Sequence, residues 1–411
     1  MVCWTGLIIS RTGGNMKSET NNPAETTDKS VDKNRRNLLK GVLGATGAAS
    51  IPSWILPALA QGEQLVPFTD VPDSFVIRPV TDGANHVLDT RQIDSYFTPN
   101  EDFYIIQHYG QPEVDNASYS LKVTGMVDRE LEFSLQDIID RNPLEMQVGF
   151  ECGGNGQRNF NGLIGNGRWR GTSLMRILEE AGIQDGAKEV VFFGADIGTE
   201  EIRGAEVETA FARSLSIEDA TRPENMIAYE MNGEPLPKHH GKPVRLLVPG
   251  WYGVANVKWL TQIHVQDTRY MGRFMGRDYV TLKKEMVGDE MRWVENSVTK
   301  MNLKSSIIRV VKMGNQHRIQ GFVLNDGTAL RSIEVKIDDG PWQLAQVNPR
   351  STKYSWKLFN FNWDNATSGE HTLVSRVTDI NGNVQASQDE LPEKVSYWED
   401  FGQFTRTINI D

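Results

Sequence analysis

Residues 228–260 read AYEMNGEPLPKHHGKPVRLLVPGWYGVANVKWL, and this stretch constrains the fold more than any other part of the chain. A turn leads into a short β-rich segment at 244–248, and a glycine-rich loop follows it. His240, Arg245 and Lys258 place cationic donors along the stretch. Taken singly, each could be a surface or structural residue. Together with exposed backbone amides, they suit an anionic ligand that carries a phosphate.

A second stretch, residues 150–160, reads FECGGNGQRNF and contains Cys152. A lone cysteine is usually a small buried hydrophobe. Here the neighbours are Gly, Asn and Arg, which favours a thiolate in a polar, electropositive loop, acting as a soft metal ligand or a nucleophile. The other cysteine is Cys3, so a disulfide framework and a cysteine-rich zinc or iron–sulfur site are excluded.

The rest of the chain divides into two regions that differ in their pattern of predicted helices and strands. From 61 to 300, short helical and β-rich segments alternate with Gly- and Asn-rich loops, which predicts an α+β domain. Its clearest helix is the amphipathic segment 172–182. From 301 to 411, strand-length segments separated by turn clusters predict an immunoglobulin-like β-sandwich. Residues 281–302 are expected to be the linker.

Residues 1–60 are predicted to be a signal peptide. A basic segment with Arg35-Arg36 precedes a weakly apolar run that ends in Ala58-Leu59-Ala60, a small-x-small cleavage pattern. Paired arginines are typical of the twin-arginine export route, so we expect a periplasmic protein. The alternative interpretation is an N-terminal membrane anchor. The true start is either Met1 or Met16.

Composition narrows the classes of function. Of the 411 residues, 39% are hydrophobic and 24% are charged, which excludes a disordered chain and a multi-span membrane protein. The formal net charge of −11 argues against a nucleic-acid partner. An acidic surface would attract a basic redox partner at low salt, or would serve solubility only.

These stretches, together with residues 103–112 (FYIIQHYGQP), resemble the sulfite oxidase family of molybdopterin-dependent oxidoreductases. The likeness extends over most of 65–411 and is closest within 228–260. It implies a sulfite-oxidase-type molybdopterin domain followed by an immunoglobulin-like dimerisation domain, and therefore a homodimer. It also implies one molybdenum held by a pterin dithiolene, with Cys152 as a protein sulfur ligand.

The resemblance assigns further residues to this site. Tyr279 matches a catalytic tyrosine that couples proton transfer with electron transfer, and Arg158 is the candidate donor to an anionic substrate. The residues that match cofactor contacts are Tyr104, Gln107, His108, Asp196, His240, Arg245, Asn256, Val257 and Lys258.

Three positions depart from the family pattern. Arginines of the family's anion pocket are replaced by Ile106, Gln157 and Thr328. Arg158 and Arg331 lie close in sequence to two of these positions. Sulfite is partly a dianion at neutral pH and prefers bidentate donors. Either a neighbouring arginine takes over this role, or the substrate is not sulfite.

The leading hypothesis is an exported molybdenum oxidoreductase that oxidises sulfite and passes electrons to a separate acceptor, such as a c-type cytochrome. The sequence has no C-x-x-C-H motif, and we expect no haem in this chain. One alternative is reduction of a sulfoxide such as methionine sulfoxide on the same cofactor, although such reductases lack the β-sandwich. Another is a non-enzymatic extracellular binding protein.

Overall fold

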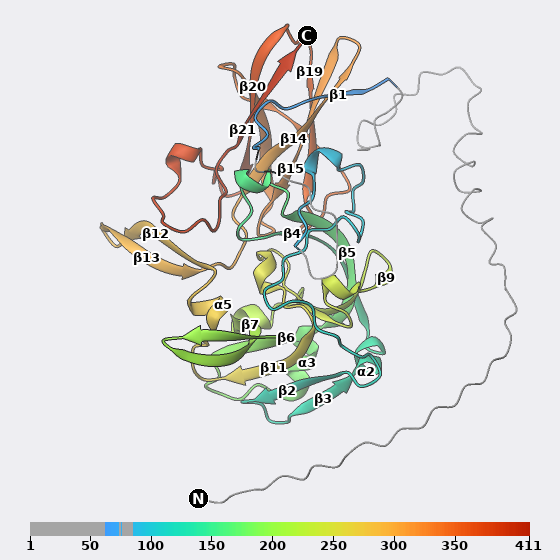
Figure 1. Ribbon diagram of the computed structural model, residues 1–411, viewed down its shortest axis with the longest axis vertical. Coiled ribbons are helices and arrows are strands. Elements are labelled where there is room, and N and C mark those ends of the chain that lie inside the picture. Colours follow the sequence, from blue (N-terminus) through green and yellow to red (C-terminus); the bar gives the residue numbers. More distant parts are fainter. Residues whose placement is uncertain (1–61, 74, 76–84) are drawn as a thin grey trace, which may run out of the picture. The chain divides into compact units, whose positions relative to one another are not determined.

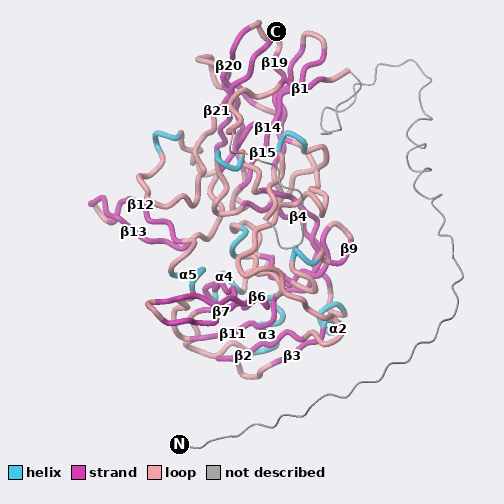
Figure 2. Tube along the Cα trace, in the orientation of Figure 1, coloured by secondary structure: helices cyan, strands magenta, loops and turns pink. Residues whose placement is uncertain are grey.

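The computed structural model describes residues 62–73, 75 and 85–411, which form several small β-sheets with few helices (Figure 1). The predicted signal peptide lies outside the described residues. Figure 2 shows how strands and loops dominate over helices. The α-helices of the described chain are α2 (Leu135–Ile139), α3 (Leu174–Ala181), α4 (Ile217–Ala220) and α5 (Arg273–Gly276). The expected α+β class is therefore corrected to a mostly β architecture, because extended strands carry nearly all of the long segments. Among the described residues, no helix has the length and apolar character needed to cross a membrane.

One sheet delivers two of the stretches singled out in the sequence. Its strands, in spatial order, are β10 (Arg245–Leu247), β8 (Met226–Met231), β5 (Ile164–Ser173) and β4 (Pro143–Glu151), and β9 (Glu234–Pro235) pairs with β8. All neighbours are antiparallel. Arg245 opens β10, and Cys152 follows the last residue of β4, so the sheet brings both residues to the same region.

A second sheet lies beside the first. Its strands, in spatial order, are β3 (Leu131–Ser134), β2 (Ser120–Gly125), β11 (Leu260–Gln266), β6 (Glu189–Ile202) and β7 (Ala205–Ser216). The pairing of β6 with β7 shifts register between Phe193 and Ile197, and Asp196 lies within this irregularity. Such interruptions of a ladder re-aim side chains, which is how a strand residue can reach a site.

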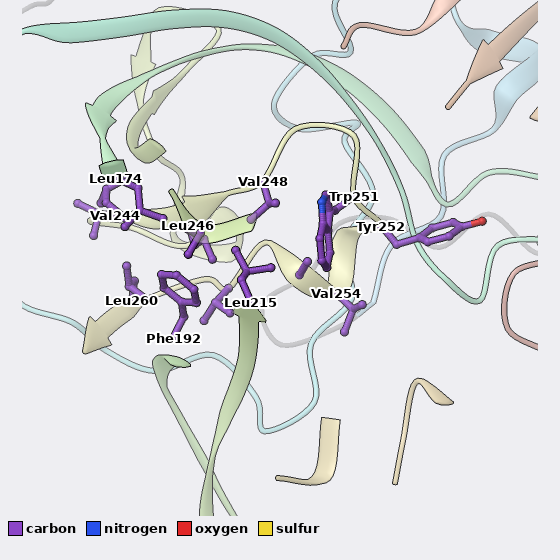
Figure 3. Close-up of a cluster of buried hydrophobic side chains, with 14 of the residues drawn as sticks. Leu174, Phe192, Leu215, Val244, Leu246, Val248, Trp251, Tyr252, Val254 and Leu260 are labelled. Atoms are coloured by element: carbon purple, nitrogen blue, oxygen red, sulfur yellow. The ribbon is translucent and has the colours of Figure 1, made fainter. Parts of the chain in front are cut away.

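A shared apolar core joins these sheets to α3 (Figure 3). The helix begins after Ser173, whose side chain accepts a hydrogen bond from the Arg176 amide, and it ends at Gly182. The amphipathic helix expected over 172–182 is thus confirmed. Its apolar face is fully buried, and each such side chain contributes about 1.5–3 kcal/mol of transfer free energy. Core residues labelled in Figure 3 are Leu174, Phe192, Leu215, Val244, Leu246, Val248, Trp251, Tyr252, Val254 and Leu260.

The C-terminal part of the chain forms two antiparallel sheets. The first has the order β1 (Gln64–Val66), β14 (Lys304–Met313), β15 (Gln316–Leu324), β19 (Lys357–Trp363) and β18 (Gln346–Val347). The second has the order β17 (Gln343–Leu344), β16 (Leu330–Ile337), β20 (Gly369–Asp379) and β21 (Thr405–Ile410). One core cluster contains side chains of both sheets, which therefore pack face to face.

Strand β1 lies far in sequence from the strands that it joins. It pairs with β14, so the first described residues belong to the C-terminal sheets. Local sequence patterns, which place residues 61–300 in one domain, do not reveal this pairing, because it joins segments more than two hundred residues apart. The domain limits 61–300 and 301–411 stay a prediction.

The expected linker, residues 281–302, is largely structured. It contains a hairpin of β12 (Val280–Val287) and β13 (Glu290–Ser297), which Figure 1 shows projecting from the sheets. Residues 393–395 run along β12, since the Val395 amide donates to the Leu282 carbonyl at 3.0 Å. This contact brings the segment just before the last strand close to the start of β12, where Tyr279 lies.

Candidate active site

An inner pocket collects most of the residues that the sequence assigned to the site. Its lining includes, among the predicted residues, Tyr104, Gln107, His108, Cys152, Asp196, His240, Arg245, Asn256, Lys258 and Tyr279. Val257 is next to this lining but does not contribute to it. Its carbonyl accepts a hydrogen bond from the Leu246 amide at 2.8 Å, and its side chain is buried in the core.

The loop that carries Cys152 is held by a ring of backbone and side-chain hydrogen bonds. The Cys152 amide donates to the Leu163 carbonyl at 3.0 Å, and the Asn155 amide donates to the Cys152 carbonyl at 2.9 Å. Gly154 permits a close approach, because a Cβ atom there would lie 3.1 Å from Trp398 and 3.2 Å from Tyr397. A larger residue would therefore require the two aromatic rings to shift by a few tenths of an ångström.

The thiol of Cys152 is not in the electropositive setting that the sequence suggested. Burial, together with the neighbouring Glu151, raises the pKa of the Cys152 thiol to about 11. The Arg158 side chain is exposed and does not contribute to this shift. The polar residues that flank Cys152 in sequence do not offset this desolvation. A metal ion is what would hold this buried group as a thiolate.

Cationic side chains form one wall of the inner pocket. Arg245 donates from Nη1 to the His240 carbonyl at 3.2 Å and from Nη2 to the Asn256 carbonyl at 2.9 Å. The Lys258 Nζ donates to the carbonyls of Ile106 and His239, both at 3.0 Å. Within the described residues, neither Arg245 nor Lys258 forms an ion pair with an acid. Asp196 offsets part of the charge of Lys258 through an electrostatic interaction, without forming an ion pair.

Burial alters the pKa values of the charged groups that line this wall. Desolvation lowers the pKa of Arg245 to about 10, and desolvation with the charge of Arg245 lowers the pKa of Lys258 to about 7. Desolvation raises the pKa of Asp196 to about 6. The buried atoms Arg245 Nε and Asp196 Oδ1 have no hydrogen-bond partner in the described structure. Buried cations outside any ion pair, together with buried polar atoms that lack a hydrogen-bond partner in the described structure, fit an anionic ligand rich in hydrogen-bonding groups.

His108 and Tyr279 stand where the inner pocket meets a larger outer cavity. His108 Nε2 lies 2.9 Å from the Tyr279 hydroxyl, and the imidazole stacks on Phe211 with a centroid distance of 5.1 Å. Burial and the charges of Lys258 and Arg273 lower the pKa of His108 to about 4. Burial raises the pKa of Tyr279 well above its usual value. Both side chains are thus neutral at neutral pH.

The outer cavity has a volume of about 720 Å³ and reaches Cys152 from the other side. Arg158 and Arg277 are the cationic side chains in its described lining. Arg277 is 3.2 Å from Glu200 in an ion pair, whereas Arg158 lies over the ring of Tyr397. Of the two arginines, Arg158 has the charge available for an anionic substrate.

The three departures from the family pattern differ in their placement. Ile106 lines both pockets. Gln157 accepts a hydrogen bond from Arg406 at 3.2 Å and lines neither pocket. Thr328 and Arg331 also lie outside both linings, and Arg331 donates to the Ile380 carbonyl at 3.0 Å. The suggestion that Arg331 replaces a pocket arginine is therefore wrong, because its side chain is engaged elsewhere.

Sequence reasoning missed the aromatic wall of the outer cavity. Trp398 stacks on Tyr279 with centroids 4.2 Å apart and planes inclined by 23°, and Tyr397 lies 4.1 Å from Trp398. The Glu399 amide donates to the Gly153 carbonyl at 2.7 Å, which fixes this segment on the cysteine loop. The available signal was the pair of adjacent aromatic residues, Tyr397 and Trp398, in a polar stretch. Tyr279, on which Trp398 stacks, lies more than a hundred residues away in the sequence.

Comparisons with known proteins agree with this geometry. Residues 108–274 match the family model described as oxidoreductase molybdopterin binding domain. The chain is 29% identical over 339 residues to sulfite oxidase of Arabidopsis thaliana, covering 72% of this chain and 84% of the relative. It is 28% identical over 364 residues to mitochondrial sulfite oxidase of Homo sapiens, covering 79% of this chain and 65% of the relative.

A solved structure shares the fold. The crystal structure of the sulfane dehydrogenase SoxCD from Paracoccus pantotrophus superposes with a TM-score of 0.68, covering 91% of this chain and 98% of that chain at 21% identity. Residues 108–274 thus match a molybdopterin-binding oxidoreductase domain, and over most of its length the chain is similar to sulfite oxidases.

Proposed function

We propose that the protein oxidises sulfite to sulfate and delivers the two electrons singly to a separate c-type cytochrome. The reaction takes one water for each sulfite and releases two protons and two electrons. The observation that carries the proposal is the convergence of Cys152, the His108–Tyr279 pair and a cationic wall on one pocket, in a chain similar to sulfite oxidases.

The residues present fit molybdopterin. His240, Arg245 and Lys258 would hold its phosphate, since Arg245 and Lys258 are buried cations outside any ion pair in the described structure and the imidazole of His240 adds a hydrogen-bonding group. Cys152 would be the protein sulfur ligand. The pterin would contact Tyr104, Gln107, His108 and Asp196, with Asn256 at the phosphate end. When bound, the molybdenum cofactor supplies oxygen-atom transfer and two-electron redox chemistry.

The chain's own residues then have separate tasks. Arg158 would bind the anionic substrate in the outer cavity, where its guanidinium is exposed. Tyr279 would orient the substrate oxygen and mediate proton exchange there, with its hydroxyl held by a hydrogen bond to the neutral ring of His108 at Nε2. Trp398 would keep the Tyr279 ring in place and exclude water from one side of the cavity.

A second candidate keeps the cofactor and changes the substrate. Ile106 and the Tyr397–Trp398 pair give the outer cavity an apolar wall, which would accept a neutral sulfoxide. In that case the enzyme would reduce a sulfoxide to a thioether with two electrons and two protons from an external donor. Arg158 would then contribute little to binding.

Three further features belong to this proposal. The chain would be exported to the periplasm through the twin-arginine signal at Arg35-Arg36. The C-terminal sheets, which pack face to face, would form an immunoglobulin-like sandwich that mediates a homodimer. No haem would be bound by this chain, so electrons would leave to a separate protein.

The test compares the two substrates on one preparation. Mature protein purified from the periplasm with molybdenum bound would be assayed for sulfite-dependent reduction of cytochrome c. The same sample would be assayed for reduction of methyl p-tolyl sulfoxide with a reduced viologen. Sulfite turnover without sulfoxide reduction supports the proposal, and the reverse result replaces it with the second candidate. Arg331→Gln is the control variant, because Arg331 lies outside both pockets.

A further inference from the structure

A buried ion pair connects the C-terminal sheets to the loop that carries Cys152. Lys304 is the first residue of β14, and its Nζ lies 2.6 Å from Glu151 Oε1 at the end of β4. The exposed fractions of the two side chains are 0% and 1%. The two partners are 153 residues apart in sequence. The pair therefore ties two distant parts of the chain together next to Cys152.

Hydrogen bonds continue from this pair into the cysteine loop. Asn155 Nδ2 donates to the same Glu151 oxygen at 3.0 Å, and Asn155 Oδ1 accepts from the Leu163 amide at 3.0 Å. Leu163 in turn accepts from the Cys152 amide through its carbonyl, and the Asn155 amide donates to the Cys152 carbonyl. Both ends of the turn from Cys152 to Asn155 are thus fixed by residues that the ion pair holds.

A buried ion pair is not by itself an effective way to raise the free energy of unfolding. Two desolvated charges cost free energy that their attraction only partly offsets, and apolar side chains of similar volume often serve as well or better. The Glu151 carboxylate also leaves Oε2 without a hydrogen-bond partner in the described structure. What the pair does provide is one defined geometry, because a charged and hydrogen-bonded network tolerates few alternative arrangements.

We propose that Lys304 and Glu151 are positioning residues that fix the Cys152 loop for metal ligation. Lys304 of the C-terminal sheets acts through Glu151 and Asn155, so those sheets complete the metal site without touching the metal. This inference rests on the proposed role of Cys152 as the molybdenum ligand.

The mature chain allows the opening of the Cys152 loop to be measured directly. Cys3 precedes the predicted cleavage site, so Cys152 is the single cysteine of the mature protein, and thiol labelling reports on this position alone. Cys152 is buried in the lining of both pockets, and opening of the loop increases the access of a maleimide to its thiol. Labelling of the cofactor-free mature protein under native conditions therefore measures how firmly the loop is held, independently of catalysis.

Three variants would be compared with wild type. Glu151→Gln removes one charge. Lys304→Met with Glu151→Gln removes both charges and keeps the hydrogen bond to Asn155 possible. Tyr354→Phe is the control, because it removes the contact of the Tyr354 hydroxyl with Glu224, which also joins distant parts of the chain, but leaves the cysteine loop untouched.

The readouts are the labelling rate, the molybdenum content per chain, the electron paramagnetic resonance spectrum of Mo(V), and the urea midpoint. We expect labelling to accelerate by about tenfold or more in both charge variants, since each lowers the cost of local opening. The molybdenum content should fall and the Mo(V) spectrum should change. The double variant should recover the wild-type urea midpoint and still show these effects, and Tyr354→Phe should show none of them.

A double variant that labels slowly and binds molybdenum with the wild-type spectrum would overturn the inference. If Glu151→Gln fails to fold, the double variant, which has no unpaired charge, still decides the question. Failure of the proposed function is separable: it would appear as wild-type protein without sulfite turnover, whereas the labelling comparison needs neither substrate nor cofactor.

Discussion

His108 Nε2 lies 2.9 Å from the hydroxyl of Tyr279, and both side chains line the inner pocket as well as the outer cavity. The pair therefore connects the region that fits the cofactor with the region open to substrate. Because burial lowers the pKa of His108 to about 4, its ring is neutral at neutral pH and can accept a hydrogen bond from the phenol, which holds the hydroxyl in place.

Replacement of Tyr279 by Phe removes the hydroxyl and keeps the ring that Trp398 stacks on. We expect kcat for sulfite to fall by about 10²–10⁴-fold, the range typical of a lost proton-transfer group. In wild type, the step that depends on His108 should be lost as the pH falls through about 4, when the ring becomes charged, and not near 6.5. Steady-state kinetics between pH 4 and 8 measure both effects. A kcat for Tyr279→Phe within a factor of two of wild type would exclude the role of the hydroxyl.

Lys258 makes the stability of the cofactor-free protein depend on pH. Its pKa is lowered to about 7 in the folded protein, whereas an unfolded lysine has a pKa of about 10.4. Between these values the unfolded chain binds a proton that the folded chain does not, so stability rises with pH from about 7 to about 10. Below pH 7 both states are protonated, and the cost of the buried charge is fully present.

We expect the free energy of unfolding of cofactor-free Lys258→Met, measured with urea at a series of pH values, to rise less steeply with pH than that of wild type. The control is Lys357→Met. Lys357 is buried in the C-terminal sheets, and its pKa is lowered to about 8 by desolvation, so this variant should lose pH dependence only above about pH 8 and keep that of Lys258 between about pH 7 and 8. If the free energy of unfolding of Lys258→Met changes with pH as steeply as that of wild type, Lys258 carries no desolvation cost in the empty pocket.

Trp398 should control catalysis through the position of Tyr279. Trp398→Ala removes the stacked ring, and a displacement of the phenol of about 1 Å would lower kcat/KM on the order of 100-fold. Trp398→Phe keeps a stacking surface and should retain most of the activity. Kinetics of both variants, with the molybdenum content measured on the same samples, test this relationship. Equal activities in the alanine and phenylalanine variants would contradict it.

Arg158 should set the affinity for an anionic substrate. Arg158→Gln removes a charge-assisted donor, which is worth about 1.5–3 kcal/mol, so KM for sulfite should rise roughly 10–100-fold. The dependence of kcat/KM on ionic strength should weaken at the same time. Arg331→Gln, by contrast, should leave KM unchanged. If both variants behave alike, the anion is bound by another group.

The sequence predicted the parts of the site that are local or that carry a long motif. The helix over 172–182 followed from its apolar period and its terminal Gly182. The cationic residues His240, Arg245 and Lys258 lie within one continuous stretch, which is why they could be assigned together. These features depend on near neighbours in the chain, where spacing and composition are informative.

The rest depends on contacts between distant segments. The stacking of Trp398 on Tyr279 exists because residues 393–395 run along β12, and the pairing of β1 with β14 joins the start of the described chain to a strand more than two hundred residues later. Burial also reversed one expectation: desolvation raises the pKa of Cys152, although its sequence neighbours are polar. Composition cannot reveal which side chains a fold removes from water.

The most direct test of the central claim needs no electron acceptor. Molybdenum-loaded mature protein would be mixed with excess sulfite in the absence of oxygen, and sulfate would be measured against molybdenum content. The account predicts about one sulfate per molybdenum in wild type, the single two-electron turnover that the bound cofactor allows, and none in Cys152→Ser. Absence of sulfate in wild type with molybdenum bound would contradict the account, and so would equal sulfate from both proteins.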